Sequence, residues 1–213
     1  MPTPSSNQPN SGFTGRNLLF VGLTAILTGY FLIWLPGPSA GLQIIGIELG
    51  EWIKFLGIGP QRNWFYLPPI VAGFSIALLA ATWPNNRPQT WVARGLAIVV
   101  ALLAFPAIAA IQLEPRSEWL ARLLAIVLVG VVALTGAWWG GRSSGRRWIW
   151  LFMGCLALIG AILPMMQFLA IRPIVAEALR RPVGVGLGVW LNMVGAVLIA
   201  FVAFSEFLRE LKK

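Results

Sequence analysis

The chain has 213 residues, of which 58% are hydrophobic and only 11% are charged, whereas a soluble domain usually carries about twice that fraction of charge. Its mean hydropathy of +0.78 indicates an integral membrane protein. The formal net charge is +9. In so apolar a chain we assign the excess of Lys and Arg to membrane orientation and to anionic lipid headgroups, and not to nucleic acid.

Missing residue types exclude several kinds of site. The sequence has no histidine and no aspartate, and Cys155 is its only cysteine. An internal disulfide, a thiolate metal cluster, a serine–histidine triad and a histidine-held zinc site therefore cannot be built. We expect no metal and no cofactor, and we identify no catalytic residue.

The first sixteen residues, MPTPSSNQPNSGFTGR, are polar and rich in Pro, Ser and Asn. Such a segment buries too little apolar surface to fold alone. It is also a poor signal peptide, because its basic residue comes late and the apolar run that follows is long enough to span a membrane. We predict a disordered tail over 1–16, a transmembrane domain over 17–206 and a short basic tail over 207–213.

Six apolar stretches are long enough to cross a bilayer, which takes about 20 residues at a rise of about 1.5 Å each. Turn-forming and basic segments such as PNNRPQT and GGRSSGRR separate them. The predicted fold is an all-α integral membrane protein with a six-helix transmembrane bundle. The predicted spans are 17–35, 65–83, 91–112, 119–139, 148–170 and 183–205.

Tryptophan and the basic residues orient these spans. Nine of the eleven tryptophans lie near predicted helix ends, which is typical of an aromatic belt at the membrane interfaces. An even number of spans puts both termini on one side, which then holds nine Lys and Arg against seven on the other. We predict a multi-pass protein of the cell membrane with both termini in the cytoplasm.

The last span carries small residues at a spacing of four, which allows helix backbones to approach closely in lipid. Asn192 lies on the same stripe and Gln167 lies late in the fifth span. Either could make an interhelical hydrogen bond or contact a solute, and both are candidate intramembrane polar contacts. The residues predicted to pack helices are Gly184, Gly188, Ala196 and Ala200.

The segment between the first two spans has its own pattern. Apolar residues recur at spacings of three and four from Leu42 to Leu56, opposite a polar face. Its 15 residues would form about 22 Å of helix, which is too short to span. We predict an interfacial amphipathic helix over 42–56, between helices 1 and 2, on the outer face.

Charged residues from this helix and from the other outer loops suggest a mixed-charge platform. We expect Glu48 or Glu51 to pair with one of the arginines there, although a solvated loop helix fits the pattern equally well. The platform would be a docking surface for a membrane-protein partner. The candidate residues are Glu48, Glu51, Lys54, Arg116, Arg122, Arg180 and Arg181.

Three functions fit these features. The first is a non-catalytic polytopic membrane protein that acts as an accessory, scaffold or assembly subunit of a larger membrane complex. The second is a transporter or channel for a small, weakly polar or lipid-like solute, with Asn192 and Gln167 as its polar contacts. The third is a lipid-modifying enzyme that uses Glu48 and Glu51 as acid and base.

Overall fold

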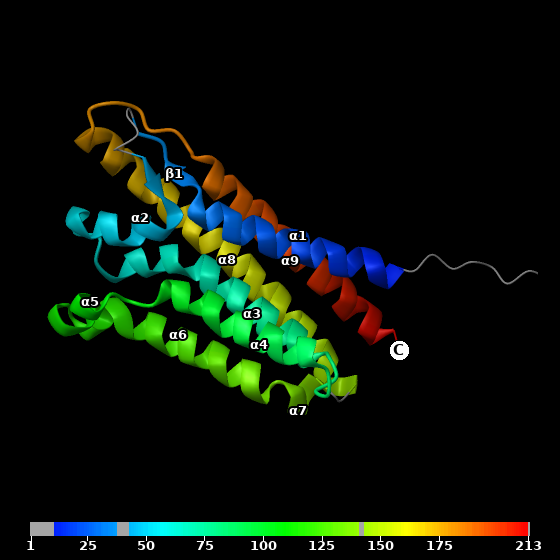
Figure 1. Ribbon diagram of the computed structural model, residues 1–213. Coiled ribbons are helices and arrows are strands. Elements are labelled where there is room, and N and C mark those ends of the chain that lie inside the picture. The colour runs from blue at the N-terminus through cyan, green and yellow to red at the C-terminus, as the bar shows by residue number, and fades with distance from the viewer. Residues whose placement is uncertain (1–10, 38–42, 141–142, 213) are drawn as a thin grey trace, which may run out of the picture.

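The computed structural model describes residues 11–37, 43–140 and 143–212, and they form an all-α bundle with a short two-stranded ladder at one end (Figure 1). The predicted all-α class is confirmed. With η for a 3₁₀ helix, the elements are α1 (Ser11–Phe31), β1 (Ile33–Leu35), β2 (Ile44–Ile45), α2 (Gly46–Trp52), η2 (Ile53–Leu56), η3 (Gly59–Tyr66), α3 (Leu67–Ala81), α4 (Pro88–Ala101), η4 (Leu102–Ala104), α5 (Ile108–Leu113), α6 (Arg116–Thr135), α7 (Ala137–Gly140), α8 (Ser143–Ala178) and α9 (Leu187–Leu211).

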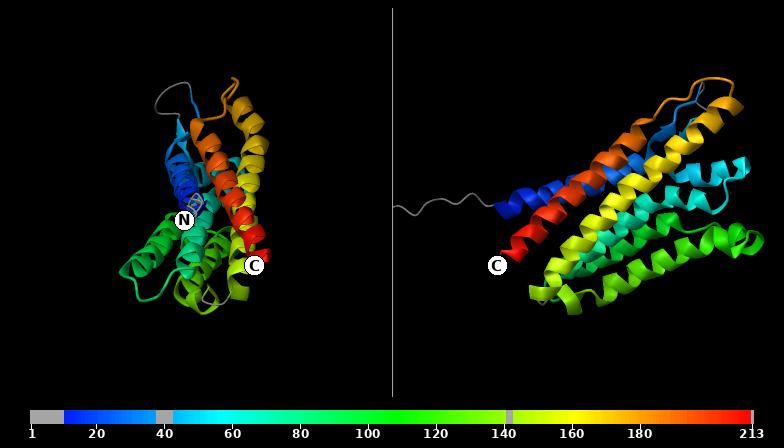
Figure 2. Two further views of the ribbon diagram at one scale, coloured as in Figure 1. Left: turned by 90° about the vertical axis from the view of Figure 1, so that its right-hand side faces the viewer. Right: turned by 180° about the vertical axis from the view of Figure 1, so that it is seen from behind.

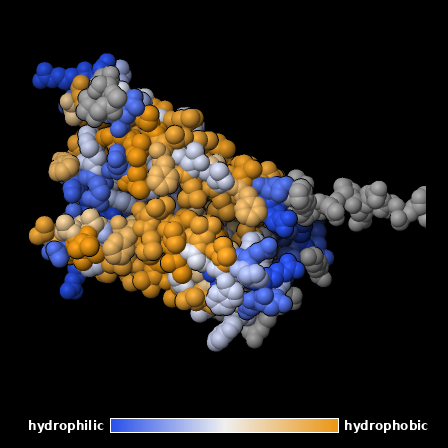
Figure 3. Space-filling view, viewed as in Figure 1, coloured by the Kyte–Doolittle hydropathy of each residue, from blue (hydrophilic) through white to orange (hydrophobic). Residues whose placement is uncertain are grey.

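Among the described residues, four helices are long and apolar enough to cross a membrane, and a shorter apolar helix covers Pro88–Ala104. This agrees with the predicted membrane class. Hydrophobic residues cover the middle of the molecule, and hydrophilic residues gather at its two ends (Figure 3). The four helices of membrane length are Gly59–Ala81, Arg116–Thr135, Gly145–Ala178 and Leu187–Leu211.

The helix α3 lies at the centre of the bundle. It contacts α1, α4, α6 and α8, and α8 crosses its face when the molecule is seen from behind (Figure 2). In the segment Gly59–Ala81, 89% of the most apolar stretch of 18 residues is buried. Small side chains make this position possible: a Cβ on Gly73 would lie 2.8 Å from the carbonyl oxygen of Ala97 on α4.

The helices α1 and α9 pack against each other through two pairs of glycines. A Cβ on Gly195 would lie 2.5 Å from the carbonyl oxygen of Gly22, and a Cβ on Gly188 would lie 2.5 Å from that of Gly29. Any larger side chain at these contacts would meet backbone, which cannot rotate away. The two glycine pairs therefore set how closely the two backbones approach, as small residues commonly do between membrane helices.

Several helix ends differ from the predicted boundaries. The helix α1 already begins at Ser11, and α9 continues to Leu211 through most of the predicted basic tail. The third predicted span breaks after Ala104, because Pro106 lacks an amide hydrogen to continue the helix. By contrast, α8 runs through Pro164 and Pro173 to Ala178. Residues 1–10 of the predicted tail and residue 213 lie outside the described residues.

The segment predicted as one interfacial helix is divided. The ladder joins Ile45 to Ile33, α2 follows, and η2 then completes the segment. Leu49 and Ile53 are fully buried, as expected for its apolar face, whereas residues 38–42 lie outside the described part of the chain. The helix α2 packs closely on η3 at Gly50, because a Cβ there would lie 2.5 Å from the ring of Tyr66.

Gly195→Ala should lower the free energy of unfolding by about 1 to 3 kcal/mol, because the added methyl group overpacks the contact between α1 and α9. Thermal unfolding of the purified protein in one detergent, followed by tryptophan fluorescence, measures the change. Gly130→Ala on α6 is the matched control, because a Cβ there meets nothing within 4 Å. Equal stability of both variants would contradict the packing argument.

Candidate functional site

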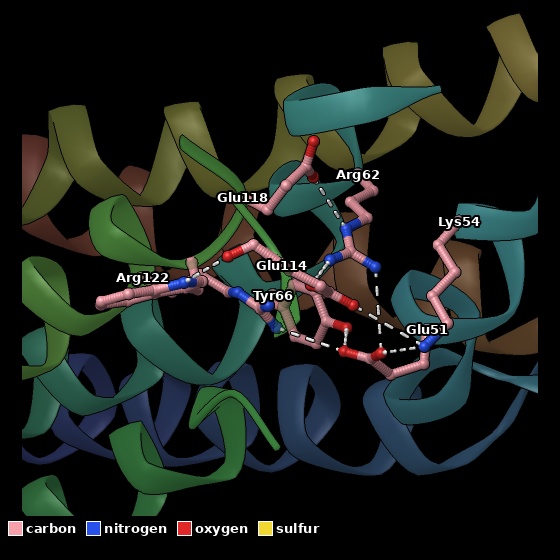
Figure 4. A network of polar contacts seen from close by, with 8 residues as sticks. Glu51, Lys54, Arg62, Tyr66, Glu114, Glu118 and Arg122 are labelled. Atoms are coloured by element: carbon pink, nitrogen blue, oxygen red, sulfur yellow. Dashed lines mark hydrogen bonds and ion pairs between the residues drawn. The ribbon is translucent and has the colours of Figure 1, made fainter. Parts of the chain in front are cut away.

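Seven side chains form an ion cluster at the end of the bundle that carries the ladder, hereafter the ladder end (Figure 4). Four of them come from the segment that runs from α2 into η3, and the others lie at the start of α6 and just before it. The two groups are about 50 residues apart in sequence. The ion cluster consists of Glu51, Lys54, Arg62, Tyr66, Glu114, Glu118 and Arg122.

Arg62 is the centre of the ion cluster and is only 2% exposed. Its Nε donates a hydrogen bond to Glu118 Oε2 at 3.1 Å, and its Nη2 donates to Glu114 Oε2. Its Nη1 lies 3.8 Å from Glu51 Oε2. One buried guanidinium thereby links η3 to two carboxylates beside α6 and to one on α2.

Glu51 is half-buried and faces three cations. It accepts a hydrogen bond of 2.6 Å from the Tyr66 hydroxyl, and Lys54 Nζ and Arg122 Nη1 lie 3.5 and 3.6 Å from its oxygens. Burial raises the pKa of the Glu51 carboxyl. The hydrogen bond from Tyr66 and the charges of Arg62, Arg122 and Lys54 lower it more, so that its pKa lies below the ordinary value of 4.5.

Arg122 stacks on the Tyr66 ring, with its guanidinium carbon 4.0 Å from the ring centre. This is a cation–π contact in a buried setting, because Arg122 is 2% exposed. None of its three side-chain nitrogens has a hydrogen-bond partner among the described residues. The positive charge is therefore balanced by the Tyr66 ring and by Glu51, and not by a bidentate carboxylate.

The ion cluster is electrically neutral, with three carboxylates and three cations. Burying a charge is expensive unless it is paired and hydrogen-bonded. Mutual neutralisation therefore binds α2, η3 and the start of α6 together. It also leaves these carboxylates surrounded by cations, which is unfavourable for proton transfer near neutral pH.

Three of the predicted interaction residues meet in the ion cluster, namely Glu51, Lys54 and Arg122. The remaining four are exposed and take no part in it: Glu48, Arg116, Arg180 and Arg181.

Sequence reasoning missed the central residue of the ion cluster, Arg62, and also Tyr66. One signal was present, because Glu118 and Arg122 are four residues apart and so share a helix face, and Glu114 comes four residues before Glu118. That spacing predicts a pair between Glu118 and Arg122. In the structure Glu118 bonds Arg62 instead.

The predicted intramembrane contacts are buried. Asn192 is 2% exposed, and its Nδ2 donates a hydrogen bond of 3.4 Å to the carbonyl oxygen of Gly160 on α8. Gln167 is 9% exposed. Of the residues predicted to pack helices, Gly188, Ala196 and Ala200 are buried on α9, whereas Gly184 is exposed and precedes that helix.

Comparison of the chain with protein families, with curated proteins and with solved structures finds no match. Among the described residues, no group of three or more His, Cys, Asp or Glu side chains could hold a metal ion. The chemistry of the site therefore rests on the ion cluster itself and on the surface beside it.

Arg62→Gln should lower the free energy of unfolding by about 3 kcal/mol, because it leaves Glu114 and Glu118 without their cation. Arg116→Gln, at the exposed start of α6, should change the free energy of unfolding by less than about 0.5 kcal/mol. Chemical unfolding in detergent compares the two variants with the wild type. A small effect of Arg62→Gln would mean that the buried guanidinium does not stabilise the fold.

Acidification should destabilise the protein partly through Glu51. Because its folded-state pKa is lowered, its contribution is complete above its ordinary pKa of 4.5 and is lost as the pH falls through the lower folded-state value. Glu51→Gln should therefore flatten the fall in melting temperature below about pH 4.5. Melting curves across this range for wild type, Glu51→Gln and the control Glu48→Gln test the point, and identical slopes in all three would refute it.

Proposed function

We propose that this chain is a non-catalytic, multi-pass membrane protein that serves as an accessory, scaffold or assembly subunit of a larger membrane complex. The ion cluster carries the proposal. Its carboxylates are bound by Arg62, Lys54 and Arg122, and the lowered pKa of Glu51 suits a structural ion pair better than an acid or a base.

Six membrane crossings fit the packing best. Besides the four helices of membrane length, α1 lies along α9, and α4 lies along α3 and α6. A helix that packs along a membrane-spanning helix lies in the same bilayer. We therefore count α1 and Pro88–Ala104 as the fifth and sixth crossings. The start of α1 and the end of α9 lie at the same end of the bundle (Figure 1), which supports termini on one side, and the bias of Lys and Arg toward that side favours the cytoplasm.

The segment from β2 to η2 then lies at the opposite interface. Its buried side chains pack into the ladder end, and Lys54 and Phe55 are exposed there. An aromatic belt is supported at the other end by Trp91, Trp138 and Trp148, which are all more than half exposed. At the ladder end, Trp34 is fully buried and its indole nitrogen donates a hydrogen bond to the carbonyl oxygen of Gly29. It therefore does not contribute to an aromatic belt there.

The two alternative functions receive less support. An acid–base pair would need Glu48 and Glu51 to face one substrate, but Glu48 lines a small hollow with Trp52 and Val183, whereas Glu51 faces the ion cluster. A solute path would need Asn192 to be accessible. It is buried, and the backbone of Gly29 lies against its own backbone.

Purification in a mild detergent tests the scaffold function. A photoreactive amino acid placed at Glu48, on the exposed side of α2, should form one discrete adduct with a partner that also co-purifies at a fixed molar ratio by native mass spectrometry. The same probe at Val92, a residue of α4 that is 70% exposed, is the control and should react with lipid. A chain that stays alone in every mild detergent, with no adduct from Glu48, would refute the proposal.

A further inference from the structure

A groove of about 400 Å³ opens on the surface beside the ion cluster. Its walls combine cations, carboxylates and an aromatic ring. It is lined by Lys54, Phe55, Gly57, Gly59, Arg62, Glu114, Pro115 and Glu118.

Two glycines give the groove its open wall. Gly57 and Gly59 have φ values of 68° and 64°, in the left-handed region that other residues rarely adopt. A Cβ on Gly57 would meet nothing within 4 Å. The turn between η2 and η3 therefore passes the groove without side chains that would fill it.

Two charged atoms of the ion cluster reach the groove without a hydrogen bond to another described residue. Arg62 Nη1 is not one of them, because it is buried and lies 3.8 Å from Glu51 Oε2, on the side of the ion cluster. Lys54 Nζ is partly exposed and makes only ion pairs of 3.5 and 3.8 Å. Glu118 bonds Arg62 through Oε2, and its Oε1 points away from that bond (Figure 4). A partly exposed ammonium donor and a carboxylate acceptor thus share one groove.

The position of the groove matches the depth of lipid headgroups. Two helices of membrane length, Gly59–Ala81 and Arg116–Thr135, both begin at its walls. Phe55 on its rim is 80% exposed and Leu113 next to it is 84% exposed. Apolar side chains at this level would contact acyl chains, while the charged walls face the interfacial layer.

We propose that this groove binds the headgroup of a zwitterionic phospholipid with a primary ammonium group, as in phosphatidylethanolamine. The ammonium donates hydrogen bonds to Glu118 Oε1, and the phosphate oxygens accept from Lys54 Nζ. The lining carries two cations and two carboxylates, so it does not favour a net anionic lipid. A choline headgroup has no N–H to donate, and it therefore binds more weakly.

The inference rests on the proposed membrane location but not on the scaffold role. Native mass spectrometry of the full chain in mixed micelles with equal amounts of phosphatidylethanolamine, phosphatidylcholine and phosphatidylglycerol measures the bound lipids. The wild type should retain phosphatidylethanolamine about fivefold more than either other lipid. Retention should fall stepwise through the mono- and dimethylated headgroups, because each methyl group removes a donor.

Two variants separate the ends of the headgroup. Glu118→Gln should bring the ratio of phosphatidylethanolamine to phosphatidylcholine close to one. Lys54→Gln should weaken both lipids equally, because the phosphate is common to them. Glu48→Gln, on α2 but outside the groove, should retain the wild-type pattern.

Equal retention of the methylated series by the wild type, or a preference for phosphatidylglycerol, would overturn the proposal even if Glu118→Gln failed to fold. A preference that persists in folded Glu118→Gln would also overturn it. The partner ratio in mild detergent is measured separately, so failure of the lipid site leaves the scaffold role standing, and failure of the scaffold role leaves the lipid site standing.

Discussion

The ladder end depends on the neutralisation of one buried guanidinium. Arg62 is 2% exposed, and a buried cation without acceptors would cost several kcal/mol. Its acceptors, Glu114 and Glu118, lie beside and on α6, so the start of α6 must stay next to η3. Since η3 leads directly into the central helix α3, this single charge also fixes the axial position of α6 along the core.

The apolar part of the bundle follows another constraint. Side chains gain little by leaving lipid for one another, so close backbone contact has to hold the helices together. The glycine pairs of α1 and α9 provide it on one side, and Gly73 provides it between α3 and α4.

Hydrophobic length predicted the long helices well, because apolar runs must hydrogen-bond internally wherever they lie. It predicted their ends poorly. The sequence predicted that the fifth span ends at residue 170 and that Pro173 opens one or two separate helical turns, but α8 continues through Pro173 because Ile171 and Val175 are buried in one apolar cluster with the ladder residues. Tertiary packing decided that boundary, and no local pattern reports it. The pairing of β1 with β2 is equally hidden, because only five residues form it.

The candidate site was partly predictable for a similar reason. Glu51, Lys54 and Arg122 could be chosen as charged residues at one predicted interface, but Arg62 lies in the polar stretch PQRN, which is typical of a loop. Its partners follow 52 and 56 residues later. Its burial is thus a property of the folded bundle, and sequence alone could suggest only that cations and carboxylates share one side.

The length of α8 has a consequence for the surrounding bilayer. Its 36 residues extend over about 54 Å, whereas the hydrocarbon layer is about 30 Å thick. In a membrane it must lean or project, and its far turns are locked to the ladder through Phe168 and Val175. A helix answers a change in bilayer thickness by a change in tilt. A change in the tilt of α8 would therefore also move the ladder end, which packs on its last turns.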